Sequence, residues 1–401
     1  MPYLFVLFIM VSAYPFAFCQ FMPLPAINIL GMLSFLILAG LLVLRRRLIT
    51  FPLAFNIIFY IQLLVWGAYS VYHSDSSYIT RFVFLSVAYM SMLFIYNYSL
   101  KGVLGFLNTF RWVIFAFAIG GTVTFFLVLF DLIEPLFYYT NPDGRVAAFY
   151  GLTCTNAFYG NIIRYAGFFD EPGAMAYWGV FSLIVNRLFF HDMKYERCLM
   201  ICLAFTFSMA YYIQLCLFLL FVKNKIRALL IFLIVVLSFL LCVHLTKDTD
   251  YDISALTIGR FEMNSRTGDV AGDNRSDLSK LAKEQFLKAP ILGIGATRMN
   301  EIAYMADNPF EILAKDGIVG EVVTYLPLLL IIGWGIKKRR TECLIIVLIL
   351  FVGYQQRPFH VDLVHPMILY ALTISILMEI DIINNNRNER SVNSHGDIQC
   401  E

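Results

Sequence analysis

The sequence predicts an all-α polytopic membrane protein, and the evidence lies in its composition and its long hydrophobic runs. Of its 401 residues, 60% are hydrophobic, 14% are charged and 38 are phenylalanine. Soluble domains average about 25% charged residues, so this chain has too little polar surface to cover a globule in water. Apolar stretches of about 20 residues, the length that crosses a bilayer, recur from end to end. We therefore predict a single integral membrane domain over residues 1–380 and a polar cytoplasmic tail over 381–401.

Basic clusters set the predicted orientation, because short cytoplasmic loops collect lysine and arginine. Such clusters lie between the apolar runs, as at Arg45–Arg47 and Lys337–Arg340. The N-terminal run lacks the basic start and the small-residue cleavage site of a signal peptide, so we interpret it as a retained first span. Single spans are expected near 3–19, 24–44, 51–71, 79–99, 112–132, 173–190, 226–245, 319–336, 341–355 and 360–379.

The apolar run at residues 198–221 needs a different account, because it has basic residues at both ends, Arg197 before it and Lys223 after it. A single span would move Lys223 outside and would also export Lys337–Arg340. Two short helices that fold back around residues 208–214 keep every basic cluster inside. A broken segment needs shielding by protein or by a water-filled cavity, so this hairpin predicts a cavity. The chain then has about twelve helices, with both termini cytoplasmic.

On this topology two large external segments, at about 133–172 and 246–318, hold most of the remaining polar residues. A third external turn covers residues 354–362. Loops on a rigid scaffold are where binding and chemistry concentrate, so we look for the functional site in these segments.

The stretch RYAGFFDEPGAMAYWG, residues 164–179, ends the first external segment. Pro172 suits the first position of a helix, and Asp170 and Glu171 before it suit the positive end of the helix dipole. Helix capping alone would explain the two acids, but it leaves Arg164 unexplained. An arginine beside aromatic rings such as Tyr165 suits a site that binds sugars and phosphate, and it equally suits an interfacial aromatic belt.

The second external segment contains further cations and a predicted surface helix. Apolar spacing predicts an amphipathic helix over Ser276–Lys288, broken by Pro290, and Asp307 to Pro309 then opens the next helix. A single arginine on a solvated loop more simply keeps the loop soluble. As a set that faces one space with Arg164, however, these arginines predict a polyanion site. The cations of this segment are Arg266, Arg275 and Arg298, which would share that site with Arg164 and Arg357, and Asp307 and Asn308 are its further candidate residues.

The third external turn adds Arg357 and His360, which lie between two predicted spans where Pro358 forces a turn. Ionisable residues at a bundle interior are functional candidates, although a lone histidine at a membrane boundary is more often structural. The acidic stretch at 248–252 lacks the glycine and glutamate of a calcium loop, and the eight cysteines show no metal spacing. We expect neither a metal nor a cofactor.

Several of these stretches occur in the order seen in the O-antigen polymerase and ligase superfamily. They are RYAGFFDEPG, TFSMAYY at 206–212, APILGIGATR at 289–298, NPFEILAKDGIVGE at 308–321 and QRPFH at 356–360. The pattern most resembles the O-antigen polymerase family and covers roughly residues 145–380. Ligases resemble one another in a histidine before the span that contains GIVG, and this chain has Asp307 and Asn308 in that place.

The resemblance implies an enzyme that joins lipid-linked sugar repeats at the periplasmic face of the bacterial inner membrane. Such polymerases transfer a growing glycan from one undecaprenyl diphosphate to a hydroxyl group of a second lipid-linked unit. The expected catalytic groups are Glu171 as general base with Arg164 and Arg275. The expected substrate-binding residues are Tyr165, Asp170, Arg298, Asp307, Asn308, Arg357 and His360. Membrane lipid and a chain-length regulator protein are candidate partners. Nucleic acid is not an expected partner, because the lysines and arginines behind the net charge of +2 sit in short clusters between the spans.

Three other classes remain as alternatives. An O-antigen ligase would use the same scaffold to transfer the glycan to lipid A core. A flippase of lipid-linked oligosaccharide would also have about twelve spans, but flippases concentrate charge within the helices, whereas these spans are nearly free of charge. A purely structural membrane protein would leave the long external segments unexplained.

The hairpin can be tested by topology reporters fused after Asn224 and after Lys338. We expect both fusions to report a cytoplasmic position, because the hairpin returns the chain to the side from which it came. Opposite sides for the two fusions would contradict the hairpin and favour a single span.

Overall fold

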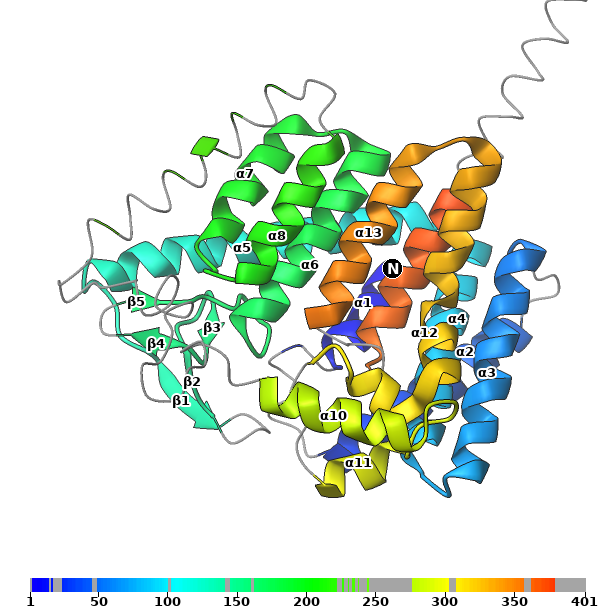
Figure 1. Cartoon of the computed structure of the whole chain (residues 1–401). Helices are drawn as coiled ribbons and strands as arrows, with labels where there is room; N and C mark the ends of the chain where they lie inside the picture. Colours follow the sequence, from blue (N-terminus) through cyan, green and yellow to red (C-terminus); the bar gives the residue numbers. More distant parts are fainter. Residues whose placement is uncertain are drawn as a thin grey trace, which may run out of the picture.

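The computed structural model in Figure 1 describes most of the chain. It covers residues 2–13, 16, 24–44, 49–99, 102–140, 145–159, 162–221, 276–302, 308–356 and 362–378, with isolated positions between 226 and 244. The first helices are α1 (Pro2–Val11), α2 (Leu24–Val43), α3 (Leu53–Tyr72), α4 (Ser77–Tyr98) and α5 (Gly102–Leu129). They are followed by α6 (Pro172–Val185), α7 (Met193–Ala204), α8 (Met209–Phe218), α10 (Ser276–Lys288), α11 (Ala296–Ile302), α12 (Glu311–Lys338) and α13 (Thr341–Gln356). A last apolar helix spans Val364–Met378.

The structure confirms that the chain is built largely of apolar helices, as predicted. Within the described part of the chain, five helices are long and apolar enough to cross a membrane, namely α3, α4, α5, α12 and α6 with its π-helical extension to Phe190. Shorter apolar helices lie at the spans predicted near 24–44, 341–355 and 360–379. The span predicted at 226–245 lies almost wholly outside the described residues, so the predicted total of twelve helices stays a prediction.

Helix α5 begins ten residues before the predicted boundary, at Gly102 in place of residue 112. The predicted start at residue 112 leaves Arg111 just outside the span. In the structure Arg111 is only 5% exposed, because its guanidinium donates to the side-chain carbonyl of Asn186 and lies against the rings of Phe190 and Tyr195. A charged side chain with partners of this kind can lie within a membrane helix. Arg111 therefore did not mark the start of the helix, and the predicted boundary was wrong.

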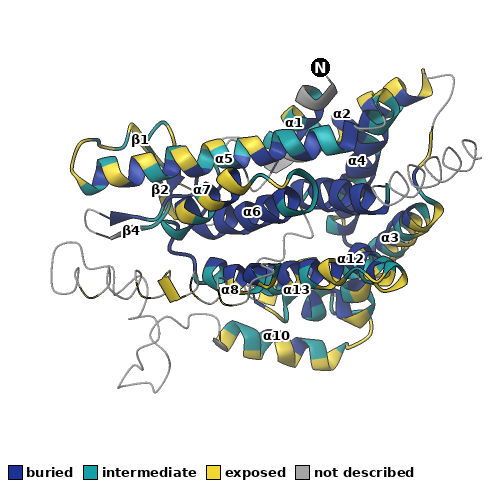
Figure 2. Ribbon diagram, turned by 90° about the horizontal axis from the view of Figure 1, so that it is seen from above, coloured by how far each residue is buried: buried dark blue, intermediate teal, exposed yellow. Residues whose placement is uncertain are grey.

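Helix α6 forms the centre of the bundle, and all 14 of its residues are buried. Figure 2 shows it dark along its length, beside α5. Its sequence PGAMAYWGVFSLIV is apolar on every side, as expected for a helix surrounded by other helices. Gly179 allows close contact with α7, since a Cβ atom there would lie 2.4 Å from a methyl group of Leu203.

The predicted hairpin is present as α7 and α8, which are joined by the turn at residues 205–208. Arg187 shows that the two open ends meet, because its guanidinium lies 3.5 Å from Glu196 at the start of α7 and donates to the carbonyl of Phe221 beyond α8. Two details differ from the prediction. The first helix begins at Met193 in place of residue 198, and the apex lies before Ser208.

The predicted fold class is all-α, but residues 133–172, predicted as the first external segment, also contain β-strands. This segment forms two small antiparallel sheets, seen beside the end of α5 in Figure 1. Strands β1 (Phe137–Thr140), β2 (Val146–Phe149) and β3 (Cys154–Thr155) pair in that order, with Tyr138 opposite Ala148, and β4 (Phe158–Tyr159) pairs with β5 (Ile162–Ile163). Aromatic and β-branched residues favour such strands, but runs of two to four residues are too short to show an alternating pattern.

The amphipathic helix predicted at Ser276–Lys288 is confirmed with the same boundaries as α10. Its predicted apolar face is the covered face, since Ala282 is fully buried and Gln285 is 7% exposed. The covering groups belong to the protein, because Ala282 lies in a small core with Met299 of α11 and Ala314 of α12. Figure 2 shows the opposite face exposed on the outside of the bundle.

Residues 289–295 run along the start of α12 with the backbones in direct contact. The amides of Ile294 and Gly295 donate to the carbonyls of Ala314 and Lys315. Glycine is required on both sides of this contact. Gly293 and Gly317 have φ values of 69° and 65°, and a Cβ atom on either would lie within 2.4 Å of a carbonyl oxygen. The glycines of PILGIG and DGIVG are therefore structural.

Asp75, in the turn between α3 and α4, fixes this segment to the bundle. Its carboxylate accepts from the amide of Thr297 at 2.7 Å and from the amide of Ser77 at 2.9 Å. Burial raises the pKa of Asp75, but these hydrogen bonds favour the charged form more strongly, so the net pKa lies below the ordinary value of 3.8.

We expect Asp75→Asn to destabilise the protein at neutral pH by about 1–3 kcal/mol, because a charge-assisted bond is lost. A depressed pKa contributes stability that is present above the unfolded-state value and is lost as the pH falls through the folded-state value. The difference in melting temperature between wild type and variant should therefore shrink below about pH 4. An unchanged difference at acid pH would contradict the assignment.

Candidate functional site

The N-terminal end of α6 is built around Pro172 and the two acids before it. Pro172 is the first helical residue, as predicted, and the carbonyl of Glu171 accepts from the amides of Ala174 and Met175. The carboxylate of Glu171 does not cap the helix. It lies 3.8 Å from the guanidinium of Arg145, with the side chain of Glu171 10% exposed and that of Arg145 55% exposed. The side chain of Glu171 thus faces a cation at the protein surface.

Asp170 lies beside the small sheet that precedes α6. It is 8% exposed, and it is close enough to Tyr139 of β1 for their charges to interact. Burial above all, together with the thiol of Cys154 and the charge of Asp170, raises the pKa of Tyr139 well above its usual value. The phenol therefore stays neutral and can donate a hydrogen bond at any physiological pH.

Arg164 connects the two quoted stretches RYAGFFDEPG and TFS. Its Nε donates to the carbonyl of Thr206 at 3.0 Å, and its own backbone is held by Ala157 and by the hydroxyl group of Thr155. Thr206 lies in the hairpin turn, where Phe207 has a positive φ of 47°. Arg164 thus holds the apex of the hairpin while its partly buried side chain stays at the edge of the site.

Tyr165 has a packing role in place of the predicted contact with substrate. It is fully buried, its hydroxyl donates to the carbonyl of Cys202 at 2.7 Å, and its ring fills the space beside Gly121. A side chain without exposed surface cannot reach a ligand in this conformation.

The other predicted site residues either lie in the second predicted external segment or fall outside the described residues. Arg298 is exposed on α11. Asn308 is 2% exposed, and its side chain accepts from the amide of Phe310, which shapes the turn that opens α12. Arg275, Asp307, Arg357 and His360 lie outside the described residues. Arg164, Tyr165, Asp170 and Glu171 thus lie on one segment that leads into α6 but have different partners, and the structure places Arg298 and Asn308 next to α12.

Sequence reasoning missed two features. Arg145, which pairs with Glu171, follows the polar sequence NPDG and gave no pattern of its own. The second is a buried ion pair between Arg81 of α4 and Asp316 of α12, whose atoms lie 2.6 Å apart with side chains 5% and 0% exposed. The signal for this pair was available, because Arg81 is an ionisable residue inside a predicted span.

Comparisons of the chain with known protein families, with curated proteins and with solved structures give no match.

The role of Arg164 can be measured as stability. We expect Arg164→Ala to lower the free energy of unfolding by about 1.5–3 kcal/mol, because a charge-assisted bond to the hairpin turn is lost. The melting temperature in detergent should fall accordingly. Arg298→Ala is the matched control, since Arg298 is exposed on α11 and should leave the melting temperature unchanged. Equal effects of the two substitutions would contradict an anchoring role for Arg164.

Proposed function

We propose that this protein polymerises lipid-linked oligosaccharide repeats, transferring a glycan from one polyprenyl diphosphate carrier to a sugar hydroxyl group on a second. The observation that carries the proposal is the site at the outer end of α6. There a shielded carboxylate, Glu171, faces the exposed guanidinium of Arg145, and Arg164 joins the same segment to the hairpin turn. The order of the sequence stretches that resemble the polymerase family supports this assignment.

In the proposed reaction the bond between the anomeric carbon and the diphosphate oxygen breaks, and a bond to the acceptor hydroxyl oxygen forms. Glu171 takes the proton of that hydroxyl group as general base. The departing diphosphate gains negative charge, and arginines placed beside it stabilise that charge. Arg145 is the exposed cation next to the base. Arg164, Arg275, Arg298 and Arg357 remain the further candidates for this role.

The apolar surface of the bundle supports a lipid-linked substrate. Helices α2 and α3 present large exposed side chains, including Leu36 at 62% and Leu64 at 73%. A polyprenyl tail can lie along such a surface in the bilayer while its diphosphate reaches the outer end. We accordingly propose that the protein lies in the bacterial inner membrane with this end facing the periplasm.

The charges inside the bundle bear on the flippase alternative. Arg81, Arg111 and Asp316 lie within the helices, so the spans are less free of charge than the sequence suggested. Each of these residues has a protein partner, as Arg81 pairs with Asp316 and Arg111 donates to Asn186. Residues engaged in this way tie helices together, which favours surface chemistry over a charged transit path.

The proposal is tested by Glu171→Gln and Arg145→Ala in cells that make the polymer. We expect each variant to insert in the membrane at the normal level. Glu171→Gln should reduce long-chain polysaccharide at least about 100-fold, the usual effect of removing an acid–base group. Arg145→Ala should reduce it about 100-fold, because a cation that stabilises the departing diphosphate is lost. Asp277→Asn is the control, because its ion pair with Lys280 on α10 is exposed. A normal ladder of chain lengths in Glu171→Gln would remove Glu171 as the base. Product attached to lipid A core would identify a ligase.

A further inference from the structure

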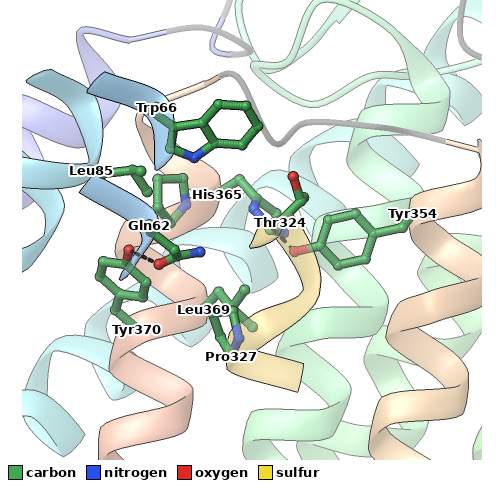
Figure 3. A pocket seen from close by; sticks show the side chains of 10 residues that line it. Gln62, Trp66, Leu85, Thr324, Pro327, Tyr354, His365, Leu369 and Tyr370 are labelled. Atoms are coloured by element: carbon green, nitrogen blue, oxygen red, sulfur yellow. Dashed lines mark hydrogen bonds between the residues drawn. The ribbon is translucent and has the colours of Figure 1, made fainter. Parts of the chain in front are cut away.

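A small cavity lies among the helices of the bundle, lined by residues other than those of the site at the end of α6. Its volume is about 20 Å³, and α3, α4, α12, α13 and the last helix surround it. The polar groups that line it are Gln62, Trp66, Thr324, Tyr354, His365 and Tyr370. Figure 3 shows Trp66, Thr324 and His365 around the same space. A volume of this size holds about one water molecule.

The cavity is built around a proline inside a helix. Pro327 has no amide hydrogen, so the carbonyl of Val323 loses its helical donor. The side-chain amide of Gln62 replaces that donor at 3.0 Å, and Gln62 is in turn held by the hydroxyl of Tyr370 at 2.6 Å. These bonds fix polar groups from three helices around Pro327.

His365 brings an unsatisfied polar atom to this space. The residue is 3% exposed, and its Nδ1 shares a hydrogen bond of 3.3 Å with the hydroxyl of Tyr354. Among the residues that the structure describes, none bonds its Nε2, which is buried. A buried polar atom without a partner costs about 1–3 kcal/mol, so a partner in the cavity is strongly favoured.

We propose that the cavity is a binding site for one water molecule, which bonds His365 Nε2 and joins the last helix to α12. Thr324 supplies the second contact. Its hydroxyl hydrogen is used on the carbonyl of Gly320, so its oxygen is left to accept from the water. The lining contains no carboxylate, which makes a metal cation a poor occupant. Water can donate and accept, and so it suits either tautomer of His365.

The ring of Trp66 lies between the cavity and the buried ion pair. Trp66 lines the cavity with one part of its ring, and the guanidinium carbon of Arg81 lies 4.9 Å from the ring centroid. Polar groups thus extend from Asp75 at the outer turn, through Arg81 and Asp316, down to His365.

The test is a density map of the full chain in lipid nanodiscs, at a resolution that shows ordered water. We expect a peak within about 3 Å of His365 Nε2 and of Thr324 Oγ1. Thr324→Val should abolish the peak. Thr373→Val is the matched control, because Thr373 is also buried and also bonds the carbonyl four residues before it, yet it does not line the cavity. It should leave the peak in place.

A cavity without density in the wild type would overturn the proposal, and so would a peak with the short contacts of a metal ion or a peak that survives Thr324→Val. Radiolytic labelling in ¹⁸O water gives a second measurement on the wild-type protein alone. We expect labelled oxygen on His365 or Tyr354, well above the level on the buried Phe181. Equal labelling of these residues would also overturn it.

Discussion

The attachment of α12 to α3 and α4 depends on one carboxylate, that of Asp316. It accepts from Arg81 at 2.6 Å and from the hydroxyl of Tyr78 at 2.7 Å, while its own carbonyl accepts from Tyr69. These bonds attach α12 to α3 and α4. Removing one partner of a buried ion pair typically costs 3–5 kcal/mol, because the other charge is left uncompensated. Gly317 is the next residue after Asp316, and its backbone packs directly against the loop that carries Gly293.

This attachment explains why the stretches APILGIGATR and NPFEILAKDGIVGE occur together. They form one structural unit, held at Thr297 by Asp75 and at Asp316 by Arg81. Their glycines serve the close approach of two backbones, so a resemblance based on them bears on the fold of this region. The chemistry proposed here depends on other residues, Glu171 and Arg145, at the end of α6.

Much of the helical fold could be predicted from the sequence, because long apolar runs and basic clusters are local signals. The boundaries of α10 and the presence of the hairpin followed from such signals. Arg111 was assigned to a loop because its burial depends on Asn186, 75 residues away. The small sheets were missed because strands as short as Cys154–Thr155 have no periodicity to detect.

The candidate site was predictable only in part, because some of its contacts join residues that are distant in the sequence. The acids before Pro172 could be found, since proline and adjacent acids mark a helix start. Their partners could not be found, because Arg145 reaches Glu171 only after β1 and β2 pair. Tyr165 was given a ligand contact because aromatic residues near arginine suit sugars, but burial against α5 depends on tertiary packing.

The hairpin constrains how the protein is made. Helix α7 has 12 residues and α8 has 10, so they are about 18 and 15 Å long, about half the thickness of a bilayer core. Neither can be inserted by the translocation machinery as an independent span. They must enter together and dock on α5 and α6, which the ribosome has already delivered. Arg164 precedes Thr206 in the chain, so the anchor for the apex is in place before the apex is synthesised. The order of synthesis thus matches the order in which these contacts can form.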